Sequence, residues 1–170
     1  MVNQGDIVTF ENVEIYNGTR NFDGLKFNDP SRKRSFGFFL EPEIAEAMAR
    51  DGWVIKYTKP PKDKPLPPDW EPRPWLKVDI SFKFRPPTVV LITSRGRTVL
   101  DEEAFDILQD ASMKMVDLSI RARFWTFDSN NTSGLKAMLH EMYVTIEESP
   151  LAMKYNAFDV HEYDEADDEE

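Results

Sequence analysis

One stretch of the chain, residues 116–127, alternates apolar residues with cations and aromatic rings. In an extended strand successive side chains point to opposite faces, so one face would carry every second residue at steps of about 6 to 7 Å. That face would hold Arg121, Arg123, Trp125 and Phe127. Cations can follow phosphates while aromatic rings stack on bases of any sequence. The pattern therefore indicates a surface suited to single-stranded nucleic acid.

A plainer interpretation of this row stays open, because Trp125 and Phe127 could cover a second small core while the arginines face solvent. Other segments also place Lys or Arg beside aromatic residues. A shared nucleic-acid-binding groove and a second small core are therefore equally favoured. Arg95 and Arg97 flank a glycine in a turn that could hold a phosphate, a weak signal because such turns are common. The nucleic-acid-binding candidates are Arg34, Lys56, Trp75, Lys77, Lys83, Arg85, Arg95, Arg97, Arg121, Arg123, Trp125 and Phe127.

Residues that could support catalysis are scarce. The chain has no cysteine and only two histidines, His140 and His161, so a catalytic triad or histidine-rich metal site has little to build from. Its seven glycines are too scattered for a phosphate-binding loop. Carboxylates at residues 101–106 leave a metal-dependent nuclease as a third hypothesis, although the start of a helix explains them more simply. The sequence predicts a non-enzymatic protein without cofactor or metal.

The net charge of -10 is concentrated at the C-terminal end. Residues 158–170 carry eight carboxylates and no Lys or Arg. Without these eight, the acidic count falls from 31 to 23 against 21 basic residues, and residues 1–98 hold 16 basic and 13 acidic side chains. The acidity of the whole chain therefore describes the tail more than the body.

The acidic tail, residues 158–170, has two interpretations of equal weight. A run of carboxylates cannot fold alone and would serve as a solubilising extension. Alternatively, it mimics nucleic acid, occupies the basic groove when DNA is absent and recruits partner proteins when DNA displaces it. The residues expected to bind partners are Phe158, Asp164, Glu165, Asp167, Asp168, Glu169 and Glu170.

Apolar alternation and turn signals divide the rest into short elements. Strands are predicted at residues 7–15, 35–40, 53–58, 75–84, 89–93, 116–127 and 135–146, and helices at residues 42–51 and 101–109. Asn17 and Gly18 indicate a turn, and residues 19–34 a mobile loop. Residues 59–74, with seven of the twelve prolines, should form an extended excursion that joins no sheet. Alternation assigns Phe84 and Phe124 to the core.

The order of these elements predicts a mainly β fold, an OB-like Greek-key barrel of six or seven strands with two short helices. The last two strands, joined by turn-forming residues, should form a hairpin. The barrel would span residues 1–157 as a single-stranded DNA-binding domain with a Pro-rich loop, followed by the tail. With no secretory segment and no apolar run of membrane-spanning length, a cytoplasmic location is the simplest expectation.

Six motifs in a fixed order are Arg-Asn-Phe at residues 20–22, Arg-Ser-Phe-Gly-Phe-Phe-Leu at 34–40, Asp-Gly-Trp at 51–53, Arg-Pro-Pro-Thr-Val-Val-Leu-Ile-Thr-Ser-Arg-Gly-Arg-Thr at 85–98, Leu-Asp-Glu-Glu at 100–103 and Met-Tyr-Val-Thr-Ile-Glu-Glu at 142–148. In these motifs the chain resembles a family of small phage and prophage proteins described as single-stranded DNA-binding. The resemblance implies an OB-type barrel that coats single strands during phage replication or recombination in the bacterial host cytoplasm. The Pro-rich insert is longer than the family pattern leads us to expect.

The leading hypothesis is sequence-tolerant binding of single-stranded DNA, with the tail as an autoinhibitor or a recruiter of replication and recombination proteins. The alternative is a phage protein-interaction module, an inhibitor or adaptor of a host enzyme that binds no DNA. No membrane association is expected. A homodimer stays open, because the sequence does not give the oligomeric state.

Overall fold

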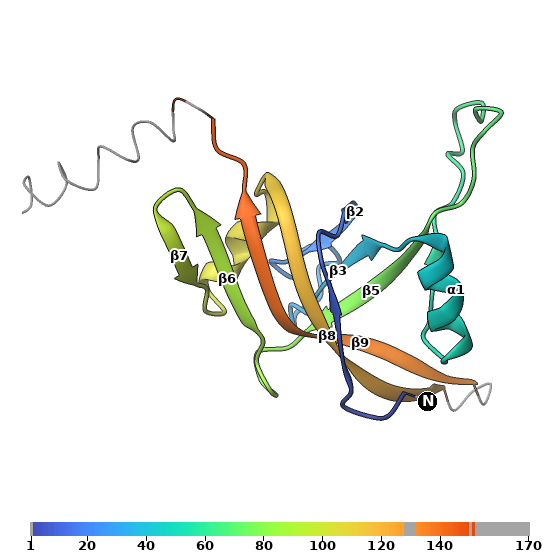
Figure 1. Cartoon of the computed structure of the whole chain (residues 1–170), viewed down its shortest axis with the longest axis horizontal. Coiled ribbons are helices and arrows are strands. Elements are labelled where there is room, and N and C mark those ends of the chain that lie inside the picture. Colours follow the sequence, from blue (N-terminus) through green and yellow to red (C-terminus); the bar gives the residue numbers. More distant parts are fainter. Residues whose placement is uncertain (1, 128–131, 150, 152–170) are drawn as a thin grey trace, which may run out of the picture.

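The computed structural model describes residues 2–127, 132–149 and 151. Within these residues, nine strands form one mixed sheet, accompanied by one α-helix and one 3-10 helix. The strands are β1 (Ile7–Phe10), β2 (Ile15–Asn21), β3 (Arg34–Phe39), β4 (Lys56–Tyr57), β5 (Pro74–Ile80), β6 (Thr88–Thr93), β7 (Gly96–Val99), β8 (Met113–Phe127) and β9 (Thr132–Ile146). The helices are α1 (Pro42–Arg50) and the 3-10 helix η1 (Ala104–Gln109) (Figure 1).

The two ends of the sheet are consecutive in the chain. Its main path runs β1-β8-β9-β5-β3-β2, while β4 pairs with β5 and the β6–β7 pair is attached to β9. In the short connection between β1 and β2, the Val13 N–H donates to the Val116 carbonyl of β8 (2.9 Å). The next carbonyl, of Glu14, accepts from Phe39 N–H of β3 (2.9 Å). The connection therefore spans from one edge of the sheet to the other.

This topology confirms the mainly β fold with two short helices and corrects two details. The described residues form nine strands instead of six or seven, because β1 and β2 are separate strands and β7 was not predicted. Their strand pairs do not close into a ring, since β1 and β2 remain the edges. The domain boundary at residue 157 and the acidic tail lie outside the described residues.

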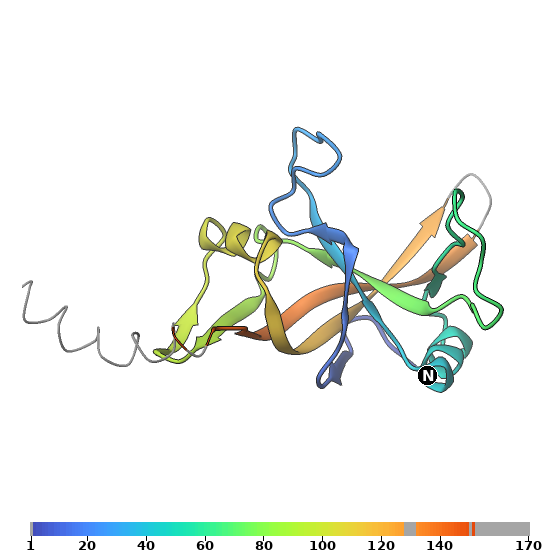
Figure 2. The ribbon, with the colours of Figure 1, turned by 90° about the horizontal axis from the view of Figure 1, so that it is seen from above.

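The β8–β9 hairpin is the longest strand pair of the sheet, with 15 residues in each strand (Figure 2). Its antiparallel register runs from Met113↔Ile146 to Phe127↔Thr132, which confirms the predicted hairpin. β9 begins at Thr132, so the end of the predicted connecting loop belongs to the strand. Because β9 has 15 residues, it pairs with β5 at Ala137 and Met138 and with β6 further along, from Glu141 to Thr145.

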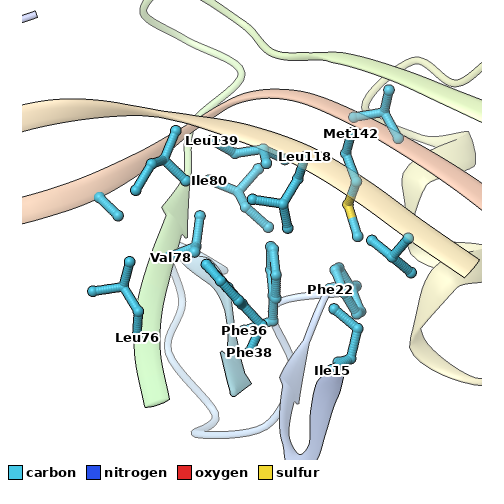
Figure 3. Packing of buried hydrophobic residues seen from close by; sticks show 14 of the residues in the cluster. Ile15, Phe22, Phe36, Phe38, Leu76, Val78, Ile80, Leu118, Leu139 and Met142 are labelled. Carbon is cyan, nitrogen blue, oxygen red and sulfur yellow. The ribbon is translucent and has the colours of Figure 1, made fainter. Parts of the chain in front are cut away.

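The hydrophobic core lies between this hairpin and strands β2, β3 and β5 (Figure 3). Phe36 and Phe38 of β3 are fully buried, as is Phe22 just after β2. Ring contacts tie these elements together, with Phe22 stacked on Phe36 at a centroid distance of 5.1 Å and Phe22 edge-on to Phe105 of η1 at 5.5 Å. Burying each such side chain stabilises the fold by about 1.5–3 kcal/mol.

Both ends of α1 carry the residues that the sequence predicts there. Pro42 occupies the first turn of α1, where its missing N–H is not needed. Gly52 follows the helix with φ 104, a left-handed conformation that favours glycine. In η1, Asp101 accepts a hydrogen bond from Ala104 N–H at 2.8 Å, as a capping residue does. The expectation of two short helices is therefore met by local chemistry at their ends.

The N-terminal segment differs from its prediction. Residues 7–15 are not one strand, because β1 ends at Phe10 and Asn12 adopts φ 50. Asn17 and Gly18 are inside β2 and make no turn. A register shift between β2 and β3 absorbs the irregularity there. The predicted loop shrinks to residues 22–33, and Phe22 anchors its start in the core.

Two further strands have other bounds than predicted, 56–57 instead of 53–58 and 74–80 instead of 75–84. Residues 53–58 supply only the short strand β4, because Trp53 is buried and bridges to Leu135 of β9 instead. β5 starts at Pro74, a position where a proline needs no ladder donor, and ends at Ile80. Phe84 therefore lies beyond the strand, in a loop.

Within the described residues, no helix has the length and apolarity needed to cross a bilayer.

Candidate nucleic-acid interface

The outward side chains of three neighbouring strands form one surface, which we call the basic face. It comprises Trp75, Lys77 and Asp79 of β5, Gly134, Lys136 and Met138 of β9, and Arg121, Arg123 and Trp125 of β8. Asp79 of β5 lies beside Met138 of β9, and Met138 in turn faces Arg121 of β8. The predicted common side of the β8 residues is present, while the Phe127 side chain lies outside the described part of the chain.

A first groove opens where β5 and β9 diverge, and we call it the Trp125 groove. It has a volume of about 270 Å³ and is lined by Trp125 and by Lys56, Lys77 and Lys136 from three strands. Asp79 is the carboxylate in this lining, 3.9 Å from Lys77 Nζ and 4.0 Å from Lys136 Nζ. Three ammonium groups against one carboxylate leave the groove positive.

An aromatic cluster of Tyr16, Phe39 and Trp75 extends the basic face across β2, β3 and β5. Tyr16 stacks on Phe39 at 4.7 Å between ring centroids and meets Trp75 edge-on at 5.3 Å. Cations lie over two of the rings, Arg73 at 3.6 Å from the Phe39 centroid and Lys56 Nζ at 5.5 Å from that of Trp75. All three rings are half-buried, so each keeps some accessible surface.

Two glycines decide how the tryptophan rings lie. A Cβ atom on Gly37 of β3 would come within 2.5 Å of Trp75 Cε3, so the Trp75 ring lies directly across this glycine. On β9, a Cβ atom on Gly134 would come within 3.2 Å of Trp125 Nε1. The missing side chains therefore allow both rings to lie against the sheet.

A second groove, the Phe84 groove, lies further along β8 and β9. It has a volume of about 530 Å³, and its lining includes Phe84, Arg85, Arg121, Arg123 and Met138. Phe84 was assigned to the core by alternation, which is wrong because β5 ends before it and the ring is 83% exposed. Arg123 of this groove pairs in register with Lys136 of the first, so the grooves adjoin.

This combination of cations and rings can be compared with known proteins. Over residues 4–169, the chain matches the family described as "Putative phage ssDNA-binding domain". The chain belongs to this phage single-stranded DNA-binding family. The family is a DNA-binding one and not an enzyme family, which confirms the prediction of a non-enzymatic protein.

Solved structures share the fold of this family member. The single-stranded DNA-binding protein from bacteriophage Enc34 aligns with a TM-score of 0.52 at 14% identity, covering 88% of this chain and 89% of that one. Its C-terminal truncation aligns with a TM-score of 0.51 at 14% identity, covering 88% and 92%. The same Enc34 protein in complex with ssDNA aligns with a TM-score of 0.48 at 15% identity, covering 88% and 94%. No curated protein matches the chain in sequence.

Arg34 was predicted to lie at the interface of this DNA-binding family member, but the structure places it inside. Its side chain is 9% exposed and pairs with Asp106 at 2.9 Å and Glu102 at 3.2 Å. It also donates to the Phe22 carbonyl at 2.8 Å. A buried guanidinium with these partners holds the loop 22–33 against η1 and is not available to DNA. Two of the four carboxylates at residues 101–106, Glu102 and Asp106, are thus engaged in ion pairs.

Two other basic residues before β3, Arg20 and Arg32, are also engaged within the protein. Arg20 Nη1 donates to the carbonyl of Leu108 in η1 at 3.2 Å and to that of Ala111, just past η1, at 2.7 Å. Burial lowers the pKa of the Arg20 guanidinium. Arg32 pairs with Asp106 at 3.1 Å. These arginines stabilise the loop and η1, so the density of basic residues in the sequence overstates the basic surface here.

Arg95 and Arg97 lie at the far end of the sheet from the two grooves. Arg95 lies in the turn between β6 and β7, and Arg97 lies in β7. β6 pairs with β9 from Glu141 to Thr145, whereas the grooves use Leu135 to Leu139 (Figure 1). Lys83 is exposed on the β5–β6 loop but is not in the lining of the Phe84 groove. Sequence reasoning missed Tyr16, Phe39 and Arg73. The alternation of Ser35, Gly37 and Phe39 along β3 was the signal that could have found the second of these.

Proposed function

We propose that the basic face binds single-stranded DNA with little sequence preference. The single observation that carries this proposal is the Trp125 groove, where a tryptophan and three lysines from separate strands converge. Family membership supports it independently. The biological setting that follows is phage DNA replication or recombination in the cytoplasm of the bacterial host.

The chemistry of the face accounts for sequence tolerance. Lysine ammonium groups recognise phosphates and tryptophan rings stack on base faces, and every nucleotide has both. Each stacked base contributes about 1–3 kcal/mol, and each neutralised phosphate releases condensed counterions. Affinity should therefore fall steeply with salt and depend little on base identity.

We also propose that the sheet is an OB-type barrel left open at one seam. β1 and β2 would act as one bent strand, since their connection bonds to β8 on one side and β3 on the other. Together with β3, β5, β8 and β9 this makes the five-stranded arrangement that OB folds use for oligonucleotides. Two rings of the aromatic cluster, Phe39 and Trp75, then lie on β3 and β5, the two strands that such folds turn toward the ligand.

The test of DNA binding is a fluorescence-anisotropy titration of labelled oligo-dT at several salt concentrations. Saturable binding that weakens with salt is expected, and the double variant Lys77→Gln/Lys136→Gln should weaken it at least tenfold. Arg97→Gln, at the far end of the sheet, is the control and should leave it unchanged. Absence of binding by the intact chain would reject the proposal and favour the protein-interaction module.

For the acidic tail, we propose that residues 158–170 compete with DNA for the basic face and recruit partner proteins once displaced. The eight carboxylates of this segment are opposite in charge to the lysines and arginines of the two grooves, as DNA phosphates are. Deleting residues 158–170 should tighten oligo-dT binding, most strongly at low salt where charge attraction is least screened. Replacing the eight carboxylates by their amides should have the same effect. If both variants bind like the intact chain, the autoinhibition proposal fails.

A further inference from the structure

Phe84 is held out in solvent by a loop with a constrained backbone. Among the exposed large apolar side chains of the described residues, it has the highest exposure, 83%. The next residue, Arg85, adopts φ 47, a conformation that costs a non-glycine residue about 1–3 kcal/mol. Two prolines follow, and Pro87 is buried. An exposed ring on a strained, anchored loop is a feature more typical of ligand binding than of packing.

The groove beneath Phe84 is strongly cationic. Arg85, Arg121 and Arg123 contribute three guanidinium groups, and no carboxylate occurs among the described residues that line it. One guanidinium group can bind two phosphate oxygens at once. The groove therefore suits an anionic ligand better than an apolar one. The volume of about 530 Å³ lies within the range of small-ligand sites, so a nucleotide fits it in size as well as in charge.

One of these arginines is oriented by an irregularity in β9. Ser119 pairs with Glu141 and Ile120 with Leu139, so His140 is an extra residue, a β-bulge. The Nδ1 atom of His140 lies 3.0 Å from Arg121 Nη2. A guanidinium only donates, so Nδ1 must accept, which leaves the imidazole proton on Nε2, 3.6 Å from Glu141 Oε1. The bulge thus places His140 beside Arg121, which lines the groove.

We infer that the Phe84 groove is a second nucleotide subsite, an inference that rests on the proposed function of the basic face. Phe84 stacks on a base, and the three arginines bind the phosphates beside it. His140 is a positioning residue that holds Arg121 in place. A strand bound in the Trp125 groove reaches this subsite across the Arg123–Lys136 pair, which separates the two grooves.

Strand length distinguishes this second subsite from the first. Oligo-dT strands of increasing length are titrated against the intact chain, Phe84→Ala and Trp125→Ala. Phe84→Ala should lose about tenfold or more in affinity for long strands but nothing for the shortest strand that binds, whereas Trp125→Ala should lose affinity at every length. Phe84→Trp, which keeps a stacking surface, should restore most of the affinity for long strands that Phe84→Ala loses.

The outcomes of this titration separate the two proposals. If Phe84→Ala binds strands of every length as tightly as the intact chain does, the second subsite is overturned while the first stands. If the intact chain binds no strand at all, the proposed function itself fails. Because the Phe84 ring is exposed, loss of the fold is not expected to confuse the result.

The role of His140 has its own test with a long strand. His140→Ala should weaken binding, and His140→Asn, whose carbonyl oxygen can stand near the position of Nδ1, should restore most of the loss. In the double variant Arg121→Ala/His140→Ala, the loss should equal that of Arg121→Ala alone, because His140 acts through Arg121. Fully additive losses, or no effect of His140→Ala, would overturn the positioning role.

Discussion

Lys136 of β9 holds its ammonium nitrogen 5.6 Å from the centre of the Trp125 ring of β8. The two residues are diagonal neighbours, since Trp125 pairs in register with Gly134 and Arg123 with Lys136. Because Gly134 has no side chain, the ring can lie toward Lys136 without a neighbour between them. Cation and ring are thereby presented together at the mouth of one groove, and this pair is the centre of the proposed DNA site.

Trp125→Ala should weaken the binding of oligo-dT by about 1–3 kcal/mol, the range for one base that stacks on an aromatic side chain. Trp125→Phe keeps a smaller ring and should lose only part of this. Anisotropy titrations measure the affinity, and circular dichroism checks that the fold is kept. Equal affinity of the alanine variant and the intact chain would show that no base stacks on Trp125.

Lys77→Gln and Lys136→Gln should each reduce the dependence of affinity on salt. For single strands, the slope of log affinity against log salt changes by about 0.7 per phosphate contact, so each variant should flatten it by about that amount. Lys114→Gln, at the opposite end of β8, removes the same charge and is the control that should keep the slope. If the slopes of the Lys77→Gln, Lys136→Gln and Lys114→Gln variants were equal, Lys77 and Lys136 would act only through the net charge of the protein.

Gly37→Ala should destabilise the protein and weaken DNA binding together. The new Cβ would lie 2.5 Å from Trp75 Cε3 and 3.0 Å from Thr19 Oγ1, and overpacking of this kind typically costs about 1–3 kcal/mol of unfolding free energy. Urea denaturation measures that loss. Gly18→Ala, whose added Cβ meets Tyr16 Cε1 at an ordinary 3.5 Å, should stay near the intact chain. If Gly37→Ala is equally stable, Trp75 does not lie across β3.

Arg34→Met should lower the unfolding free energy by about 1–3 kcal/mol, because it leaves the Phe22 carbonyl and Asp106 without their shared donor. The affinity of the folded variant for DNA should not change. Arg123→Met, on the exposed basic face, should behave in the opposite way, with lower affinity and unchanged stability. Weaker DNA binding by fully folded Arg34→Met would return Arg34 to the interface.

Alternation along a strand predicted part of the site and failed where the sheet ends. Val116, Leu118, Ile120 and Ala122 are buried as expected, and Arg121 and Arg123 on either side of Ala122 face outward. Phe124, next in the same pattern, is 55% exposed, because β1 pairs with β8 only as far as Arg121 and the core does not continue beneath it. Phe84 fails for the same reason at the end of β5. Periodicity predicts which side a residue takes, but burial needs something on that side to cover it.

The sequence also did not indicate which residues far apart in the chain contact one another. Arg34 looks like any basic loop residue until Asp106, distant in the chain, is found 2.9 Å away. Trp53 appeared to belong to a basic and aromatic strand, yet it is buried and bridges to Leu135. In each case a residue far along the chain decided the environment.

By itself, the sequence determined the properties that depend on neighbours in the chain: the β8–β9 hairpin, the ends of α1, the charge of the tail and the row of Arg121, Arg123 and Trp125. Only the tertiary structure decided which rows lie side by side. The parallel contact of β5 with β9 brings Lys77 beside Lys136, and the loop after β5 brings Phe84 to the arginines. Such contacts arise from the burial of apolar faces that are distant in sequence, and no local pattern encodes their register.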